Sequence, residues 1–152
     1  MKNIKMIDIE PGIIKGVHVQ MPLNESRYRE RYFEWCSSTL IAPMKTNKIT
    51  GGVLKAWCHT PVFTEVEYHV DVEMFYFISG TALMLFIDIK NGTPDMSTAQ
   101  IARIKAGTQI LISAGKGHFV PVAEGNEPVH IIVVSPSMDA PRIEIFEPIE
   151  GI

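Results

Sequence analysis

From residue 53 onward, short runs of β-branched and aromatic residues are separated by turn residues. The runs span residues 53–59, 65–78, 81–88, 101–105, 109–113, 119–123, 129–135 and 142–146. Gly80, the segment 91–94 and the segment 115–117 lie between runs, and their Gly, Asn and Pro residues favour turns. Because no helical pattern separates these runs, they predict an all-β fold, a small antiparallel sandwich or barrel.

The segment 24–35 has a helical pattern instead. It contains neither proline nor glycine, and Asn24 can cap its start. Tyr28, Tyr32 and Trp35 are spaced four and three residues apart, which places their rings on one face of a helix. We therefore expect a short N-terminal helix whose aromatic face packs against the protein.

The length and composition are typical of one globular domain. The chain has 152 residues, of which 46% are hydrophobic and 20% are charged. We expect a single domain over residues 1–152, with an N-terminal extension over 1–52 and a barrel core over 53–147. Asp and Glu number 17 and Lys and Arg 14, which gives a net charge of −3. Without a basic excess, nucleic acid is not expected as a partner.

No membrane or secreted location is expected either. The longest uncharged stretch, residues 74–87, is shorter than the roughly 18–20 residues of a membrane-spanning helix. Asp8 and Glu10 lie where a signal peptide would have an apolar run. Cys36 and Cys58 give neither a disulfide framework nor a metal-type spacing. The sequence is therefore typical of a cytoplasmic protein with reduced thiols.

Ionisable residues alternate along the candidate strand 65–78. If the strand is unbroken, residues of one parity share a face. These residues are Glu65, Glu67, His69, Asp71, Glu73, Phe75 and Phe77. Four carboxylates on one face repel each other unless the strand bends or a cation lies among them. Carboxylates beside an imidazole suit a divalent Mn, Fe, Ni, Co or Zn ion, so the pattern predicts a metal site.

His118 adds a second motif, and together the two resemble the motifs of the cupin family. The first motif is present as Glu67-x-His69-x3-Glu73-x6-Gly80, and the second as Gly107-x5-Ser113-x-Gly115-x2-His118-x3-Val122. The spacing is kept, but Glu67, Ser113 and Val122 replace the usual His, Pro and Asn. The resemblance implies a jelly-roll barrel whose metal ligands are Glu67, His69, Glu73 and His118.

A narrower resemblance is to the ureidoglycolate lyase family, which is itself cupin-like. The matching segments are 65–69, 73–75, Gly80, 94–98 and His118. Glu73 stands where that family tends to carry Gln, and Gly117 replaces a bulky aromatic residue. The resemblance implies a lyase of purine catabolism that cleaves ureidoglycolate to glyoxylate and urea. It also raises Asp95 and Ser97, otherwise typical turn residues, to candidate substrate-binding residues.

Two classes of function remain open from the sequence. In a metal-dependent enzyme acting on a small molecule, Glu73 is either a metal ligand or the general base. Phe75 and Phe77 are then candidate pocket residues beside it, and Lys116 is a candidate to hold a substrate carboxylate and assist catalysis. The same groups suit a sugar isomerase or an iron dioxygenase. Alternatively, the barrel binds or senses a sugar or small carboxylate without catalysis.

Apolar positions outside the candidate site predict a homodimer. If the ionisable face points inward, Met74, Tyr76 and Ile78 lie outside, and residues 81–87 are apolar at nearly every position. Large exposed apolar patches are uncommon on monomers, and a two-fold pair is the commonest way to cover one. The segment 24–35 either covers part of this surface or reaches across to the partner.

Overall fold

The computed structural model describes residues 1–22 and 28–152, which form strands and loops without a helix. The strands are β1 (Lys2–Ile4), β2 (Met6–Asp8), β3 (Val17–Gln20), β4 (Tyr28–Arg29), β5 (Glu34–Trp35), β6 (Ile49–Ala56), β7 (Val62–Glu67), β8 (Glu73–Ser79), β9 (Thr81–Lys90), β10 (Thr93–Lys105), β11 (Gln109–Ile112), β12 (Lys116–His118), β13 (Val122–Ala123), β14 (Val129–Pro136) and β15 (Arg142–Gly151). The all-β expectation is confirmed.

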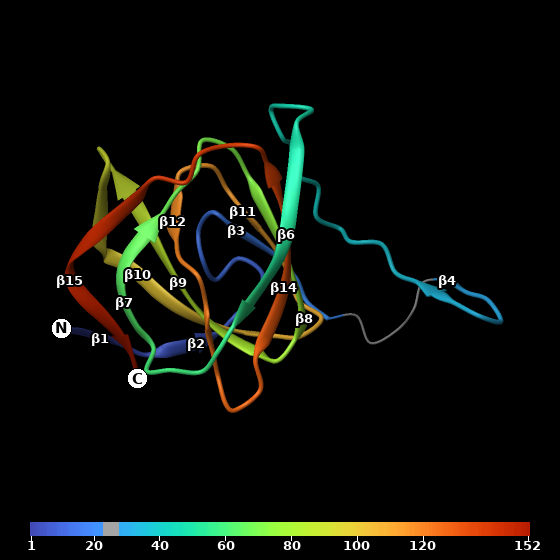
Figure 1. Ribbon diagram of the computed structural model, residues 1–152, viewed down its shortest axis with the longest axis horizontal. Helices are drawn as coiled ribbons and strands as arrows, with labels where there is room; N and C mark the ends of the chain where they lie inside the picture. The colour runs from blue at the N-terminus through green and yellow to red at the C-terminus, as the bar shows by residue number, and fades with distance from the viewer. Residues whose placement is uncertain (23–27) are drawn as a thin grey trace.

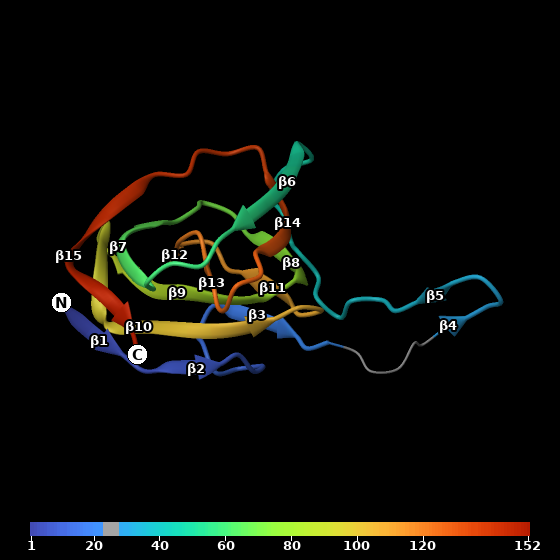
Figure 2. The ribbon, with the colours of Figure 1, turned by 60° about the horizontal axis from the view of Figure 1, so that its bottom comes forward.

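Two sheets face each other and form a nearly closed barrel (Figures 1 and 2). The eight-stranded sheet has the order β1-β15-β7-β12-β9-β10-β2, and β13 pairs with β9 beside this path. The five-stranded sheet has the order β3-β11-β8-β14-β6. The β1–β15 and β2–β10 pairs are parallel, and the other pairs in the two sheets are antiparallel.

Strand β9 is buried on both of its faces. Met84 and Phe86 belong to the main core between the two sheets. Leu85 and Ile87 belong to a second core, all of whose buried residues come from the eight-stranded sheet, which curls around them. The apolar character of residues 81–87 is therefore satisfied within one chain, and this part of the argument for a dimer was wrong.

The stretch 65–78 is broken into two strands on different sheets. β7 ends at Glu67 in the eight-stranded sheet, and β8 begins at Glu73 in the five-stranded sheet. Asp71 lies in the connection, where its carboxylate accepts hydrogen bonds of 2.8 Å from the backbone N–H groups of Lys45 and Val72. The bend separates the carboxylates that an unbroken strand would align, and it places Glu67 and Glu73 on opposite walls of the barrel.

The expected N-terminal helix is not found where the structure describes that segment. Residues 24–27, with the proposed cap Asn24, lie outside the described residues, while residues 28–35 form the β4–β5 hairpin. Tyr28 pairs with Trp35 and Arg29 with Glu34 across it. Aromatic residues favour strands, and intervals that align rings on a helix also allow cross-strand pairs in a hairpin, so the spacing alone was misleading.

The sheets extend beyond the barrel core expected over 53–147. β1, β2 and β3 pair with β15, β10 and β11, and β15 continues to Gly151. β1, β2 and β3, which lie within the segment 1–52, are thus strands of the two sheets. In the described residues, no helix has the length and apolar character needed to cross a membrane.

Candidate metal centre

Side chains from both sheets converge inside the barrel at the ends of three strands. Glu67 ends β7, His118 ends β12 and Glu73 begins β8, while His69 lies in the connection between β7 and β8. Glu67 and His118 are direct partners in the β7–β12 pair. The ligand atoms of Glu67, His69 and His118 all lie within 4.8 Å of one another. These three residues form a group that can hold a metal ion.

Glu73 lies against both imidazoles. Its Oε2 atom is 2.9 Å from Nε2 of His69 and 3.0 Å from Nε2 of His118. Only the contact with His118 has hydrogen-bond geometry, so the buried Nε2 of His69 has no hydrogen-bond partner among the described residues. Oε1 of Glu67 lies 3.9 Å from Nε2 of His118. The Glu67 side chain is 19% exposed, and the other three are less than a tenth exposed.

Both imidazoles are oriented by backbone carbonyls. Nδ1 of His118 donates to the Lys116 carbonyl at 3.1 Å, and Nδ1 of His69 donates to the Asp139 carbonyl at 3.4 Å. A carbonyl oxygen only accepts, so in a neutral ring each Nε2 presents a lone pair to the Glu73 carboxylate. Acceptors that face each other at this distance repel, and a cation between them removes the repulsion. Such an outer partner on Nδ1 is typical of metal-ligating histidine.

The shifts in pKa reflect the attraction between the Glu73 carboxylate and a protonated imidazole, in contrast to the repulsion between the carboxylate and neutral rings. Burial raises the pKa of Glu73, but the two imidazoles outweigh it and lower the pKa to about 2. Burial lowers the pKa of His69, but the adjacent Glu73 carboxylate, with smaller effects of Asp139 and Glu67, leaves that pKa above its usual value. The cluster therefore favours positive charge next to Glu73.

The group of Glu67, His69 and His118 fits a divalent ion, and Glu73 lies against both of its imidazoles. Donor atoms that bind one ion at about 2.0–2.2 Å lie roughly 3–4 Å from each other, and the contacts of 2.9, 3.0 and 3.9 Å within the cluster lie in this range. The buried Nε2 atom of His69 has no hydrogen-bond partner among the described residues, and its lone pair is one that a metal ion can accept. Two imidazoles and two carboxylates are suitable ligands for Mn, Fe, Co, Ni or Zn.

Phe75 and Phe77 belong to the main core, where they are 4% and 2% exposed. The ring of Phe75 meets the ring of His118 edge to face, with centroids 6.0 Å apart. Phe75 thus packs beside the cluster, and Phe77 lies next to it in the core, with ring centroids 6.4 Å apart. Both rings are buried from solvent, so their observed role is packing around the cluster.

Gly117 precedes His118 because no side chain fits there. A Cβ atom on Gly117 would lie 2.8 Å from Cγ2 of Ile87 and 3.0 Å from its carbonyl oxygen. The close approach of β12 to β9 explains why this position lacks the bulky aromatic residue of the ureidoglycolate lyase pattern.

Lys116 is engaged in an ion pair inside the barrel. Its Nζ atom lies 2.8 Å from Oδ1 of Asp88, its direct partner in the β9–β12 register. The Lys116 side chain is 5% exposed and that of Asp88 29%. The lysine charge is already compensated, which weakens the expectation that it holds a substrate carboxylate.

Asp95 and Ser97 lie near the start of β10 and form a local turn. The Asp95 carboxylate accepts hydrogen bonds from the Ser97 backbone N–H at 3.1 Å and from the Ser97 hydroxyl at 2.6 Å, and it pairs with Lys90. The hydrogen bonds found for these two side chains are local and do not reach the candidate metal centre. The hydrogen bonds of this local turn therefore explain why Asp95 and Ser97 occur at these positions.

Sequence reasoning missed two partners of the site. Asp88 could be identified as the partner of Lys116 only from the register of β9 against β12, and the spacing of the motifs does not contain this register. Asp139 contributes a backbone carbonyl, and no residue type signals such a contact. A buried lysine does, however, require a carboxylate partner, and Asp88 lies at the end of the apolar run 81–88.

Comparison with known proteins finds similarity in backbone shape. No protein-family model matches the chain, and no curated protein matches it significantly. A variant of Bacillus subtilis oxalate decarboxylase has a TM-score of 0.46 and 19% identity over 64% of this chain and 24% of that chain. A structure of the same enzyme described for its Mn(II) centres has a TM-score of 0.46 and 17% identity over 90% and 30% of the two chains.

A third similar structure is the formate complex of Lactobacillus farciminis oxalate decarboxylase. Its TM-score is 0.45 and its identity 19%, over 64% of this chain and 26% of that chain. The chain thus spans 24–30% of the length of these decarboxylases.

Proposed function

We propose that this protein is a metal-dependent enzyme of cupin-like fold, with one divalent ion held by Glu67, His69, Glu73 and His118. The observation that carries the proposal is the convergence of two buried Nε2 atoms on the Glu73 carboxylate at 2.9 and 3.0 Å, with no hydrogen bond to satisfy the His69 nitrogen within the described structure. The mixed nitrogen and oxygen donors favour Mn, Fe, Co, Ni or Zn over Mg or Ca, which prefer oxygen alone.

The substrate is a small molecule with a hydroxyl or carboxylate group. When bound, the ion supplies Lewis acidity that lowers the pKa of a coordinated hydroxyl group. Glu67 is the most exposed of the four residues, with 19% of its side chain accessible, so it marks the side from which a substrate approaches. His69 and His118 are held by backbone carbonyls and keep the donor set in place. Glu73 contacts both imidazoles through one oxygen, which suits a ligand more than a free base.

The specific reaction that we propose is the cleavage of a carbinol urea, with ureidoglycolate as the first candidate. This choice rests on the resemblance of segments 65–69 and 94–98 to the lyase family. It requires a group that accepts the hydroxyl proton and returns a proton to the leaving urea nitrogen as the C–N bond breaks. Glu67 is the carboxylate of the cluster with access to solvent, so its oxygen that is not bound to the ion can carry this proton. The ion pair of Lys116 with Asp88 speaks against Lys116 as the carboxylate anchor.

A second candidate is an iron-dependent dioxygenase. Glu67, His69 and His118 alone are two histidines and one carboxylate, the donor set of many non-haem iron oxygenases. If Glu73 is not a ligand, this candidate is favoured.

Metal titration followed by assays of the loaded protein tests the proposal. We expect calorimetry to give one site per chain for at least one of Mn, Fe, Co, Ni or Zn. The loaded protein should then release glyoxylate and urea from ureidoglycolate, and oxygen uptake with small carboxylates would instead identify the dioxygenase. Metal binding without turnover of ureidoglycolate, sugars or small acids would contradict the enzyme proposal and leave a metal-binding module. Absence of metal binding would contradict both.

A further inference from the structure

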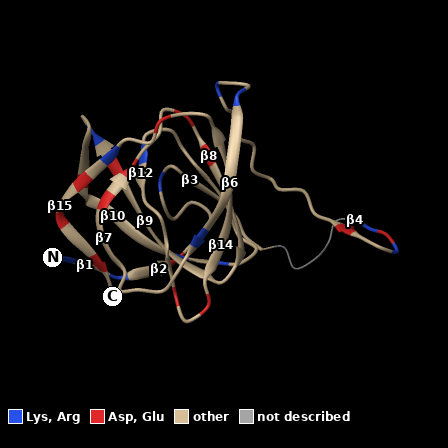
Figure 3. Cartoon of the chain, in the orientation of Figure 1, with Lys and Arg blue, Asp and Glu red and all other residues tan. Residues whose placement is uncertain are grey.

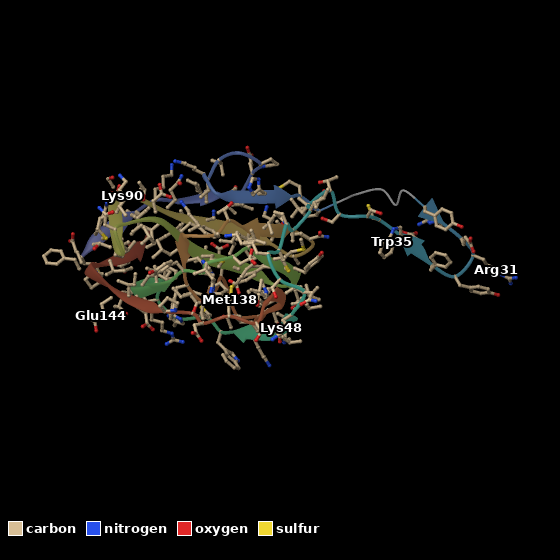
Figure 4. All side chains as sticks on the ribbon, turned by 90° about the horizontal axis from the view of Figure 1, so that it is seen from above. Arg31, Trp35, Lys48, Lys90, Met138 and Glu144 are labelled. Atoms are coloured by element: carbon tan, nitrogen blue, oxygen red, sulfur yellow. The ribbon has the colours of Figure 1, made fainter. Side chains whose placement is uncertain are left out.

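The hairpin of residues 28–35, hereafter the arm, projects from the side of the barrel that carries the five-stranded sheet (Figures 1 and 2). Figure 4 shows the labelled residues Arg31 and Trp35 beyond the edge of the barrel. The arm carries exposed aromatic rings: Tyr32 is 83% exposed, Trp35 62%, Phe33 51% and Tyr28 50%. Such a set of exposed rings is unusual on a soluble chain unless a partner covers it.

The segment that follows the arm is tied to the barrel. The backbone N–H of Thr39 donates to the side chain of Gln20 at 3.2 Å, and that of Lys45 donates to Asp71 at 2.8 Å. The arm lies before the first of these anchors and points away from its own barrel (Figure 4). The rings are therefore held where a second molecule can meet them.

The outer side of the same sheet has an apolar surface, hereafter the open face. It consists of the exposed residues Ile49, Val53, Trp57, Ile78 and Ile132 on or next to β6, β8 and β14. Val53 and Ile132 are direct partners, and Ile132 also pairs with Tyr76, so they form a continuous row across the three strands.

Charged residues are nearly absent from these strands. β14 carries none (Figure 3), and β6 carries only Lys55. The one charged residue of β8 is Glu73, which is buried against the imidazole of His118. Depletion of charge together with exposed aromatic and aliphatic side chains is the composition of an interface core.

We propose that two copies of this chain form a two-fold dimer in which each arm lies across the open face of the other copy. Both surfaces belong to one chain and flank the same sheet, so a two-fold axis brings each arm to the partner's face in an equivalent way. Tyr32 and Phe33 provide the aromatic contacts, and Val53 and Ile132 receive them. The proposal stands independently of the proposed function.

The available area suits a stable dimer. Aromatic side chains bury about 150–250 Å² each, so the exposed parts of the four arm rings offer on the order of 500 Å² per copy. Two arms and the two faces they cover together bury about 2,000 Å², which lies at the upper end of a standard protein–protein interface.

Molar mass in solution is the first test. Sedimentation velocity or light scattering of the full chain at micromolar concentration should give about twice the chain mass of 17.0 kDa. Tyr32→Ser with Phe33→Ser on the arm, and Val53→Lys on the open face, should each shift the mass toward the monomer. Phe146→Ser, which changes a fully exposed aromatic residue on β15 of the other sheet, should leave the dimer intact. A monomeric wild-type protein would overturn the proposal, as would arm or face variants that dimerise as strongly as the wild type.

A disulfide trap identifies the contact itself. In a background with Cys36→Ser and Cys58→Ser, one chain carries Tyr32→Cys and the other Val53→Cys. Oxidation of the mixture should give a cross-linked pair that contains one of each chain, and neither variant alone should cross-link. Self-cross-linking of either variant would show a different interface. An intrachain disulfide in a monomeric double variant would show that the arm folds onto its own barrel. Either result would refute the exchange of arms.

Discussion

At the scale of single residues, the surroundings of two glutamates explain why one belongs to the candidate metal centre. Glu65 and Glu73 lie in the same alternating stretch of sequence. Glu65 pairs with Arg142 at 3.2 Å and is one-third exposed, whereas Glu73 is buried between two imidazoles. The alternating pattern predicted that Glu65 and Glu73 share one face of a strand. The break after Glu67 instead places them on different sheets.

Glu73→Gln tests whether this carboxylate is a ligand. The amide keeps the size of the side chain but removes the charge that faces both Nε2 atoms. We expect the affinity for the preferred metal to fall by at least about tenfold, measured by calorimetry or competition with a chelator. Glu65→Gln is the matched control and should bind metal like the wild type. Equal affinities for the two variants would remove Glu73 from the ligand set and favour the three-residue dioxygenase site.

Lys116→Met tests the role of the buried ion pair. The substitution leaves Asp88 without its 2.8 Å partner, so we expect the free energy of unfolding to fall by about 1–3 kcal/mol, measured by urea denaturation. Lys90→Met, which removes an exposed lysine paired with Asp95, should leave stability nearly unchanged. If Lys116→Met keeps full stability and instead raises KM for an acidic substrate, Lys116 binds substrate as the sequence suggested.

At the scale of elements, close strand packing positions His118. β12 is three residues long, and its register against β7 and β9 places the imidazole between Glu67 and the core. Gly117 permits this register because the neighbouring Ile87 leaves no space for a side chain. The glycine before the histidine is therefore a structural requirement of the candidate metal centre.

Gly117→Ala should weaken both folding and metal binding. The added methyl group must displace β12 from β9, and overpacking of this type costs about 1–3 kcal/mol of unfolding free energy. Because His118 moves with the strand, metal affinity should fall as well. Gly52→Ala is the control, since a Cβ there meets nothing within 4 Å. Unchanged metal affinity in a destabilised Gly117→Ala protein would show that His118 is positioned by other contacts.

The segment 28–35 shows the limit of periodicity at this scale. Rings at intervals of four and three residues suit a helix, but the observed hairpin pairs Tyr28 with Trp35 instead. A short helix needs tertiary packing to persist, and this segment projects away from the barrel, so the barrel does not support the helical form (Figure 1). Local spacing could not predict this position away from the barrel.

At the scale of the whole molecule, the all-β barrel could be predicted because its strands are short, apolar and bounded by turns. The meeting of His69 and His118 could be predicted only because the two motifs that contain them resemble those of the cupin family, since the spacing within each motif does not place one motif beside the other. The partners Asp88 and Asp139 could not, because both depend on long-range register and loop placement. The dimer argument from residues 81–87 failed for the same reason, since the curl of one sheet buries them.

Metal stoichiometry tests the central claim most directly. After incubation with each divalent ion and dialysis, elemental analysis of the wild-type protein should find about one ion per chain for the preferred metal. The double variant His69→Ala/His118→Ala should retain none, because both nitrogen donors that face Glu73 are lost. His130→Ala, which alters a histidine bonded to Ser79 outside the cluster, should bind as the wild type does. Stoichiometric metal in the double variant, or no metal in the wild type, would contradict the candidate metal centre.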